Sequence, residues 1–233
     1  MTLPKAGQVV KLSKDLDEEA TIDIPPADTG ATAYPAGIST DGDGNVWVAA
    51  QDSGVVYEID AGAEKISETY DNTGAAAPFG IARAGSNIWV VDRTGNQVIK
   101  YDIDKKEVVT SIPVGANPKG VAIAGNAIFV ANTDDGTVSV IGLESNEAEK
   151  PIDVKGQPRA VDVLGSHVWV SNGDEVSAVD AQEENGWVTA INSATHEIDD
   201  TVKVGGSPEG VGVGEDRVWV ATGTEQLARA IEP

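Results

Sequence analysis

The chain has 233 residues, with 38 acidic against 16 basic side chains and a formal net charge of −22. A field of that sign repels nucleic acid and anionic membrane surfaces, which excludes nucleic-acid binding. There is no cysteine, so disulfides and thiolate chemistry are excluded. The N-terminus has no signal-peptide-like apolar run, and no stretch of 18 apolar residues occurs. We therefore expect a soluble monomer without membrane insertion.

The acids do not form one block but are scattered through turns, as at Asp134-Asp135 and Glu183-Glu184. This distribution favours a solvated, solubilising surface. Adaptation of the protein to high salt is the alternative. Melting curves from low to high salt separate the two, because salt screens self-repulsion and would stabilise a salt-adapted protein.

One sequence motif occurs five times along the chain. Each copy begins with Pro-x-Gly and continues with a short apolar strand, a Gly/Asn turn, a strand centred on an aromatic residue and a Gly-x-Val-x-x-Ile segment. Its aromatics fall 42, 40, 40 and 50 residues apart, at Trp47, Trp89, Phe129, Trp169 and Trp219. A fixed period near 40 residues with four short strands per copy is typical of a β-propeller blade. The sequence therefore predicts an all-β fold, a β-propeller of about five four-stranded blades.

The strands within one copy differ in composition. The first two, the inner and second strands, are near-continuous apolar runs such as Val168–Ser171, which suits strands covered on both faces. We therefore expect the aromatics to pack between blades. Third strands such as Val138–Ile141 alternate and are half-buried, whereas outer strands carry charges and prolines that protect an edge.

The two ends of the chain complement each other. Residues 7–25 match a third and an outer strand, whereas residues 209–233 match an inner, a second and a third strand. We expect the N-terminal outer strand Ala20–Ile24 to complete the last blade and close the ring. Val9–Leu12 and Leu227–Ile231 both claim the third position of that blade, and the sequence does not choose between them.

The segment FVANTDDGTVSVI, Phe129–Ile141, is followed by an outer strand and a further Pro-x-Gly-like crossing. In this pattern the chain resembles the YVTN-repeat β-propeller family and the virginiamycin B lyase-like propellers over about residues 7–231. Such propellers usually have six to eight blades. Residues 1–233 are thus expected to be a single β-propeller domain, or alternatively a segment of a larger propeller. The resemblance also implies an extracytoplasmic or secreted location.

The turn Asp41–Asn45 has acids at alternate positions, as calcium loops begin. Calcium needs six or more oxygens, including a bidentate acid further on, and here an apolar strand follows at once. A tight turn with Gly and Asn at positive φ accounts for the pattern. We expect no metal site and no cofactor.

The two histidines, His167 and His196, fall in turns that lie at the same end of a blade. Polar turn residues are the favoured interpretation, because catalysis needs a histidine that converges with carboxylates or a nucleophile. The lyase-like relatives are understood to use His and Glu with magnesium in a central funnel. Neither histidine here starts a strand that would line a funnel, so we assign no catalytic residue and lean against an enzyme.

The chain crosses from one blade to the next at each Pro-x-Gly motif or its equivalent, and we call its proline the crossing proline. The residue after each crossing proline opens an inner strand, and we expect five such residues to surround one mouth of the central channel. Lys119 and Arg159 are adjacent cations in an acidic protein, and Arg can bind a carboxylate through two hydrogen bonds. Pairing of both cations with acids such as Glu209 or Asp92 is the alternative. The predicted ligand-binding residues are Phe79, Asp92, Lys119, Asn132, Arg159, Asn172 and Glu209.

An insertion of about ten residues within Asn172–Gly186 lies on the same side, either as a functional loop or as a neutral acidic one. The sequence therefore predicts a non-enzymatic binding module for a small anionic ligand or a protein partner on the Pro-x-Gly face. The alternatives are a virginiamycin B lyase-like, metal-dependent enzyme and a structural repeat segment of a larger extracytoplasmic or sensor protein.

Overall fold

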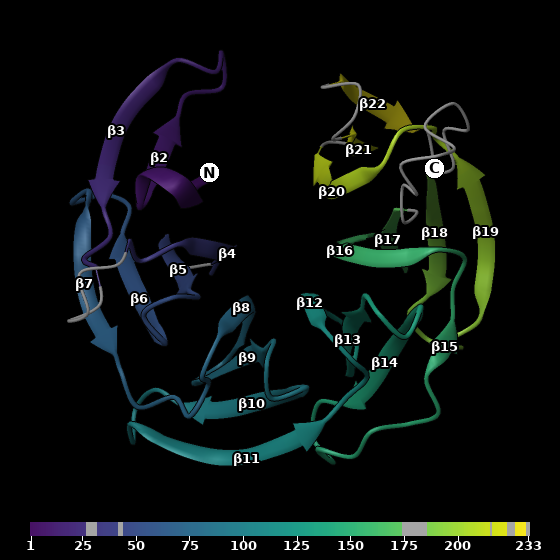
Figure 1. Ribbon diagram of the computed structural model, residues 1–233, viewed down its shortest axis with the longest axis horizontal. Coiled ribbons are helices and arrows are strands. Elements are labelled where there is room, and N and C mark those ends of the chain that lie inside the picture. The colour runs from purple at the N-terminus through teal and green to yellow at the C-terminus, as the bar shows by residue number, and fades with distance from the viewer. Residues whose placement is uncertain (27–31, 42–43, 174–185, 215, 223–226, 232–233) are drawn as a thin grey trace. The chain divides into compact units, whose positions relative to one another are not determined.

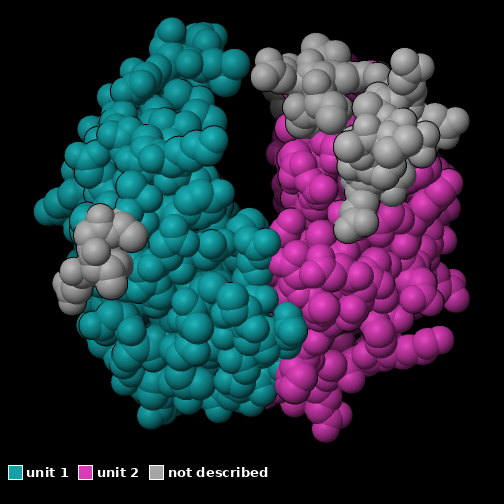
Figure 2. Space-filling view, in the orientation of Figure 1, with its two compact units in different colours: residues 1–112 teal, residues 113–233 magenta. Residues whose placement is uncertain are grey.

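The computed structural model describes residues 1–26, 32–41, 44–173, 186–214, 216–222 and 227–231. Most of them lie in short antiparallel strands (Figure 1). The chain divides into two compact units, residues 1–112 and residues 113–233, which Figure 2 draws in different colours. No helix in the described part has the length and apolar character needed to cross a membrane.

Unit 1 contains three sheets, which we call A, B and C. Sheet A has the strand order β1-β2-β3, sheet B β4-β5-β6-β7 and sheet C β11-β10-β9-β8. One 3-10 helix, η1 (Pro4–Ala6), joins β1 to β2. The strands are β1 (Thr2–Leu3), β2 (Gln8–Leu12), β3 (Glu18–Asp23), β4 (Pro35–Thr40), β5 (Asn45–Ala50), β6 (Val55–Asp60), β7 (Lys65–Tyr70), β8 (Pro78–Ala84), β9 (Asn87–Asp92), β10 (Gln97–Asp102) and β11 (Glu107–Pro113).

Unit 2 contains sheets D, E and F, with the orders β12-β13-β14-β15, β16-β17-β18-β19 and β20-β21-β22. The strands are β12 (Pro118–Ala124), β13 (Ala127–Asn132), β14 (Thr137–Gly142), β15 (Ile152–Asp153), β16 (Gln157–Leu164), β17 (His167–Gly173), β18 (Trp187–Asn192), β19 (Ile198–Lys203), β20 (Pro208–Gly214), β21 (Arg217–Thr222) and β22 (Leu227–Ile231).

The all-β prediction is confirmed, but the described residues form six sheets, where about five blades were expected. The sixth sheet, sheet A, was not predicted because its first strand, β1, is only two residues long. Thr2 pairs with Val9 and Leu3 with Gln8, so β1 supplies the strand that residues 7–25 lack. A two-residue strand has no periodicity that a sequence could display.

Sheet A also settles the competition for the third position of the last blade. Leu227–Ile231 forms β22 and pairs with β21, whereas β2 pairs with β1 and β3. The segment that we assigned to the last blade, Ala20–Ile24, forms most of β3 in sheet A, so that assignment is wrong.

Each crossing proline marks a β-bulge. The register between inner and second strand shifts just after Pro35, Pro78, Pro118, Pro158 and Pro208. A bulge inserts an extra residue and re-aims the side chain that occupies it. Those re-aimed residues are Ala36, Phe79, Lys119, Arg159 and Glu209, the five that the sequence analysis grouped together.

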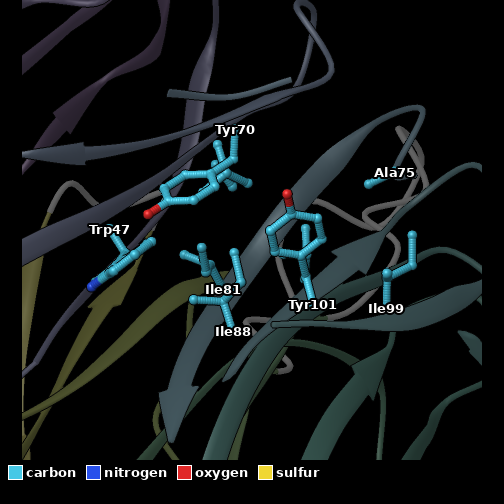
Figure 3. Packing of buried hydrophobic residues seen from close by; sticks show 10 residues of the cluster. Trp47, Tyr70, Ala75, Ile81, Ile88, Ile99 and Tyr101 are labelled. Carbon is cyan, nitrogen blue, oxygen red and sulfur yellow. The ribbon is translucent and has the colours of Figure 1, made fainter. Parts of the chain in front are cut away.

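The apolar core lies between neighbouring sheets. Figure 3 shows this packing between sheets B and C, where Trp47 and Tyr70 meet Ile81, Ile88 and Tyr101. The rings of Trp47 and Tyr70 lie 5.6 Å apart between centroids. Phe129 of sheet D is covered in the same way by Val168 and Val170 of sheet E, so the predicted inter-sheet packing of these aromatics is confirmed.

Trp219 does not follow its counterparts. Trp47, Trp89 and Phe129 are 0% exposed and Trp169 is 5% exposed, but Trp219 is 43% exposed. Sheet F covers Trp169 with Val218 and Val220, and within unit 2 no later sheet is described that could cover Trp219. The expectation of burial for this aromatic was wrong.

Candidate functional site

Three of the predicted ligand-binding residues end second strands and are buried there. Asp92 is 2% exposed, and Asn132 and Asn172 are 0% exposed. Asn132 donates to Thr137 Oγ1 at 3.0 Å and Ser139 Oγ at 2.9 Å. Asn172 donates to Thr189 Oγ1 at 2.8 Å and to a backbone carbonyl. Both amides therefore donate to the next strand of the same sheet, Asn172 also donates within its own strand, and these bonds position the strand ends.

Asp92 binds the crossing that enters its own sheet. Its Oδ1 accepts from the backbone amide of Ala77 at 3.1 Å, and its Oδ2 accepts from Gln97 Nε2 at 3.1 Å. Burial raises the pKa of this carboxyl, but the hydrogen bonds from Gln97 and from backbone amides outweigh burial and hold the pKa below its usual value. Asp92 thus acts in the described contacts as an ionised clamp for the loop.

Arg159 and Glu209 come together in unit 2. They occupy the bulges of the neighbouring inner strands β16 and β20, and the Arg159 Nη1 group forms an ion pair with Glu209 Oε1. The Arg159 side chain is 18% exposed, whereas that of Glu209 is 53% exposed. Burial lowers the pKa of Arg159 from its ordinary value, although a guanidinium stays charged at neutral pH.

A glycine makes room for this guanidinium. A Cβ atom at Gly173 would lie 3.0 Å from Arg159 Nε, 3.2 Å from Arg159 Cζ and 3.0 Å from Ser207 Oγ. Arg159 Nε is buried and has no hydrogen-bond partner in the described structure. The inner part of the guanidinium is therefore enclosed beside Gly173 and Ser207, and its Nη end is directed at Glu209.

Lys119 occupies the equivalent bulge in β12, the inner strand that lies beside β16. Three consecutive inner strands of unit 2 thus present Lys, Arg and Glu at one register position. We call these three residues, together with Gly173 and Ser207, the crossing edge of unit 2. Thr133 supports it, because its hydroxyl donates to the Pro158 carbonyl at 2.8 Å.

Phe79 belongs to unit 1 and has a cation on its ring. Arg93 Cζ lies 5.5 Å from the ring centroid, and Arg93 Nη1 donates to Gln51 Oε1 at 3.3 Å. Arg93 and Gln51 were missed by the sequence analysis. Each directly follows a second strand, and that recurring position was the signal that could have found them.

Asp162 was also missed. It lies in the inner strand β16, and its carboxylate accepts from the Val213 amide of sheet F at 2.9 Å and from the Val163 amide at 2.8 Å. Burial raises the pKa of Asp162 above its ordinary value, and these hydrogen bonds offset only part of the effect. The equivalent residues of the other inner strands are small: Ser39, Ala82, Ala122 and Gly212.

The two histidines lie at the strand ends away from the crossing edge, each beside a carboxylate. His196 Nδ1 is 2.9 Å from Glu149 Oε2, and the ring packs edge-on against Phe129. His167 Nε2 is 2.8 Å from Asp199 Oδ2, and hydrogen bonds from Asn192 and His167 lower the pKa of Asp199. Each histidine therefore joins a different pair of segments.

Ser166 extends the contact between His167 and Asp199 into a Ser-His-Asp chain. Its Oγ is 3.4 Å from His167 Nδ1. That contact is at the long limit for a hydrogen bond to a hydroxyl, and His167 and Asp199 are 33% and 44% exposed. The arrangement fits a partly exposed contact between His167 and Asp199 that stabilises a turn better than it fits an activated nucleophile.

In the predicted turn at Asp41–Asn45, the carboxylate of Asp41 is engaged by neighbouring protein groups. Asp41 accepts hydrogen bonds from the Asn45 amide at 2.9 Å and Trp47 Nε1 at 3.1 Å, and it pairs with Arg83. Residues 42–43 lie outside the described residues. Among the described residues, no group of three or more His, Asp or Glu side chains is arranged to hold a metal ion. Of the insertion, residues 174–185 lie outside the described part.

The chain was compared with protein-family models, curated proteins and solved structures, and only solved structures match it. No protein-family model matches the chain, and no curated protein matches it. A streptogramin B lyase structure aligns with a TM-score of 0.70 and 20% identity, covering 94% of this chain and 70% of that chain. A catalytically inactive virginiamycin B lyase from Staphylococcus aureus with quinupristin gives 0.70 and 16%, covering 94% and 71%. Kuenenia stuttgartiensis hydrazine synthase gives 0.64 and 18%, covering 85% and 66%.

The chain is a β-propeller. The expected resemblance to virginiamycin B lyase-like propellers is confirmed as a likeness of fold. At 20% identity or less, that likeness extends to architecture and not to chemistry. The YVTN-type repeat and the extracytoplasmic location stay predictions.

Proposed function

We propose that this propeller is a binding module whose crossing edge of unit 2 recognises an anionic small molecule or an acidic group on a protein partner. The observation that carries the proposal is Arg159, a guanidinium enclosed beside Gly173 whose Nη1 group contacts the half-exposed side chain of Glu209. Partial desolvation strengthens the interaction of such a group with an anion.

The surrounding residues support the same interpretation. Lys119 places a second cation at the equivalent position of the neighbouring strand, in a protein whose net charge is −22. Buried polar contacts of Asn132, Asn172 and Thr133 position the strand ends behind this edge. A preorganised binding surface requires supporting hydrogen bonds of this kind, which hold its binding residues in place.

An enzyme of the virginiamycin B lyase type is the second candidate, and the likeness of fold is the observation that favours it. Such an activity would have to draw on residues other than the histidines that the relatives are understood to use, because both histidines of this chain contact carboxylates at the strand ends away from the crossings. Metal-dependent catalytic turnover that persists in an Arg159→Ala variant would favour the enzyme candidate.

A thermal-shift screen with succinate, citrate and inorganic phosphate tests the binding proposal at constant ionic strength. We expect at least one anion to raise the melting temperature of the wild type. Arg159→Ala should remove the shift, and Lys119→Ala should reduce it. If no anion stabilises the wild type, or if both variants respond as the wild type does, the crossing edge is not the site.

We further propose that residues 1–233 form one domain. A compact monomer of this length has a radius of gyration of about 17–18 Å. A much larger radius from solution scattering of a monomeric sample would contradict a single compact domain.

A further inference from the structure

The ion pair at the crossing edge has two unequal partners. Arg159 is largely buried beside Gly173 and Ser207, while more than half of the Glu209 side chain is exposed. The guanidinium is therefore fixed and the carboxylate is the partner that can leave. Breaking the contact returns a well-hydrated carboxylate to water but leaves a partly desolvated cation, which then favours another anion.

Glu209 also presents the chemistry that the proposed ligand would present. Its Oε1 pairs with Arg159 Nη1, at the end of the guanidinium that is not enclosed. Arg159 Nε is buried beside Gly173, so a ligand would approach the Nη end of the guanidinium, where Glu209 binds. Both oxyanions would need the same donor.

We propose that Glu209 is a built-in competitor, a tethered carboxylate that a ligand carboxylate must displace from Arg159. The ligand class is accordingly a carboxylate rather than a cation or a neutral sugar. This inference rests on the proposed binding function and adds the mechanism by which the site is held closed. When no ligand is bound, Glu209 pairs with Arg159. The apparent affinity for the carboxylate ligand is then reduced in proportion to the fraction of molecules in which this pair is formed.

Glu209→Gln tests this directly, because it keeps the length of the side chain and removes its charge. A partly exposed ion pair of this kind corresponds to about a two- to fivefold change in an equilibrium constant. We therefore expect the variant to bind succinate or citrate about two- to fivefold more tightly than the wild type in calorimetric titrations.

Glu147→Gln is the matched control. It removes one negative charge from the same unit, in the turn that joins β14 to β15 at the strand ends away from the crossings. If both variants gain equally, the gain is a general charge effect and the competitor proposal is wrong. Equal affinity of wild type and Glu209→Gln also overturns it, but leaves the binding function intact as long as Arg159→Ala still abolishes binding.

A ligand-free measurement separates the two proposals. A thermal double-mutant cycle of Arg159→Ala and Glu209→Gln reports whether the two side chains interact in solution. We expect the effects on melting temperature to be non-additive. Additive effects would overturn the competitor proposal whether or not any carboxylate binds, whereas coupling without binding of any probe would retain the contact and reject the binding function.

Discussion

Gly120 and Gly210 occupy the same position of two inner strands but face different surroundings. A Cβ atom at Gly120 would lie 2.8 Å from the Arg159 carbonyl oxygen and 2.8 Å from the Val161 nitrogen. Those atoms are backbone of β16, which cannot rotate away as a side chain could. At Gly210 the nearest atom to a Cβ would be the Cβ of Ala221, at 3.8 Å, an ordinary van der Waals contact.

We expect Gly120→Ala to destabilise the protein by about 2 kcal/mol, within the usual range of roughly 1–3 kcal/mol for overpacking. For a chain of this length that corresponds to a fall in melting temperature of roughly 4–8 °C. Gly210→Ala should be neutral or stabilise by about 0.5 kcal/mol, because alanine restricts the unfolded chain and no clash opposes it. Neither glycine has a positive φ that alanine would strain.

Urea and thermal denaturation of the two variants in the same buffer measure this difference. A Gly120→Ala variant within about 0.5 kcal/mol of the wild type would refute the close approach of β12 and β16. If Gly210→Ala were as damaging as Gly120→Ala, another sheet would have to cover the Trp219 face of sheet F.

Three other outcomes follow from burial and charge. Trp89→Ala should cost roughly 3–5 kcal/mol, as for other buried aromatics, and Trp219→Ala about 1 kcal/mol or less because its ring is 43% exposed; equal costs measured by urea denaturation would contradict this. The pKa of Asp162 is raised in the folded state, so its ionisation costs stability as pH rises through and above its ordinary value; Asp162→Asn should be relatively more stable at pH 7 than at pH 3. The pKa of Asp92 is lowered, so its contribution is present above the ordinary value and is lost as pH falls; Asp92→Asn should lose stability at pH 7 and approach the wild type at pH 3. Melting curves across that range with the opposite signs would overturn both assignments.

The fold could be predicted because its requirements repeat. In sheets B and D a glycine lies where the next inner strand approaches, at Gly37 and Gly120, and the aromatics of the second strands lie where the next sheet packs, so both recur near a 40-residue period. The exceptions are positions where the local structure is not a repeat. The strand β1 is too short to show periodicity, and Trp219 keeps the repeat's residue without the sheet that buries its counterparts.

The site was predictable only in part. The re-aimed bulge residues Arg159 and Glu209 could be located from their prolines, and their pairing was one of the two alternatives considered. Gly173 could not be recognised, because its role depends on a side chain from the neighbouring strand that approaches within 3.0 Å of its absent Cβ. Asp162 was missed because the bulge after Pro158 shifts the alternation that assigns side chains to faces.

The net charge of −22 bears on what the crossing edge can bind. At long range the protein repels a carboxylate, whereas at contact Arg159 attracts it. Salt screens the first effect more strongly, because the Debye length is about 8 Å at physiological ionic strength and about 30 Å at 0.01 M. Association of a carboxylate should therefore become faster as salt rises from low to physiological concentration, which is the reverse of ordinary electrostatic steering. The contact with a partly buried guanidinium is screened less, so dissociation should change less over the same range. A ligand that instead associates more slowly with added salt would be a cation attracted by the surface, and the crossing edge would not be its site.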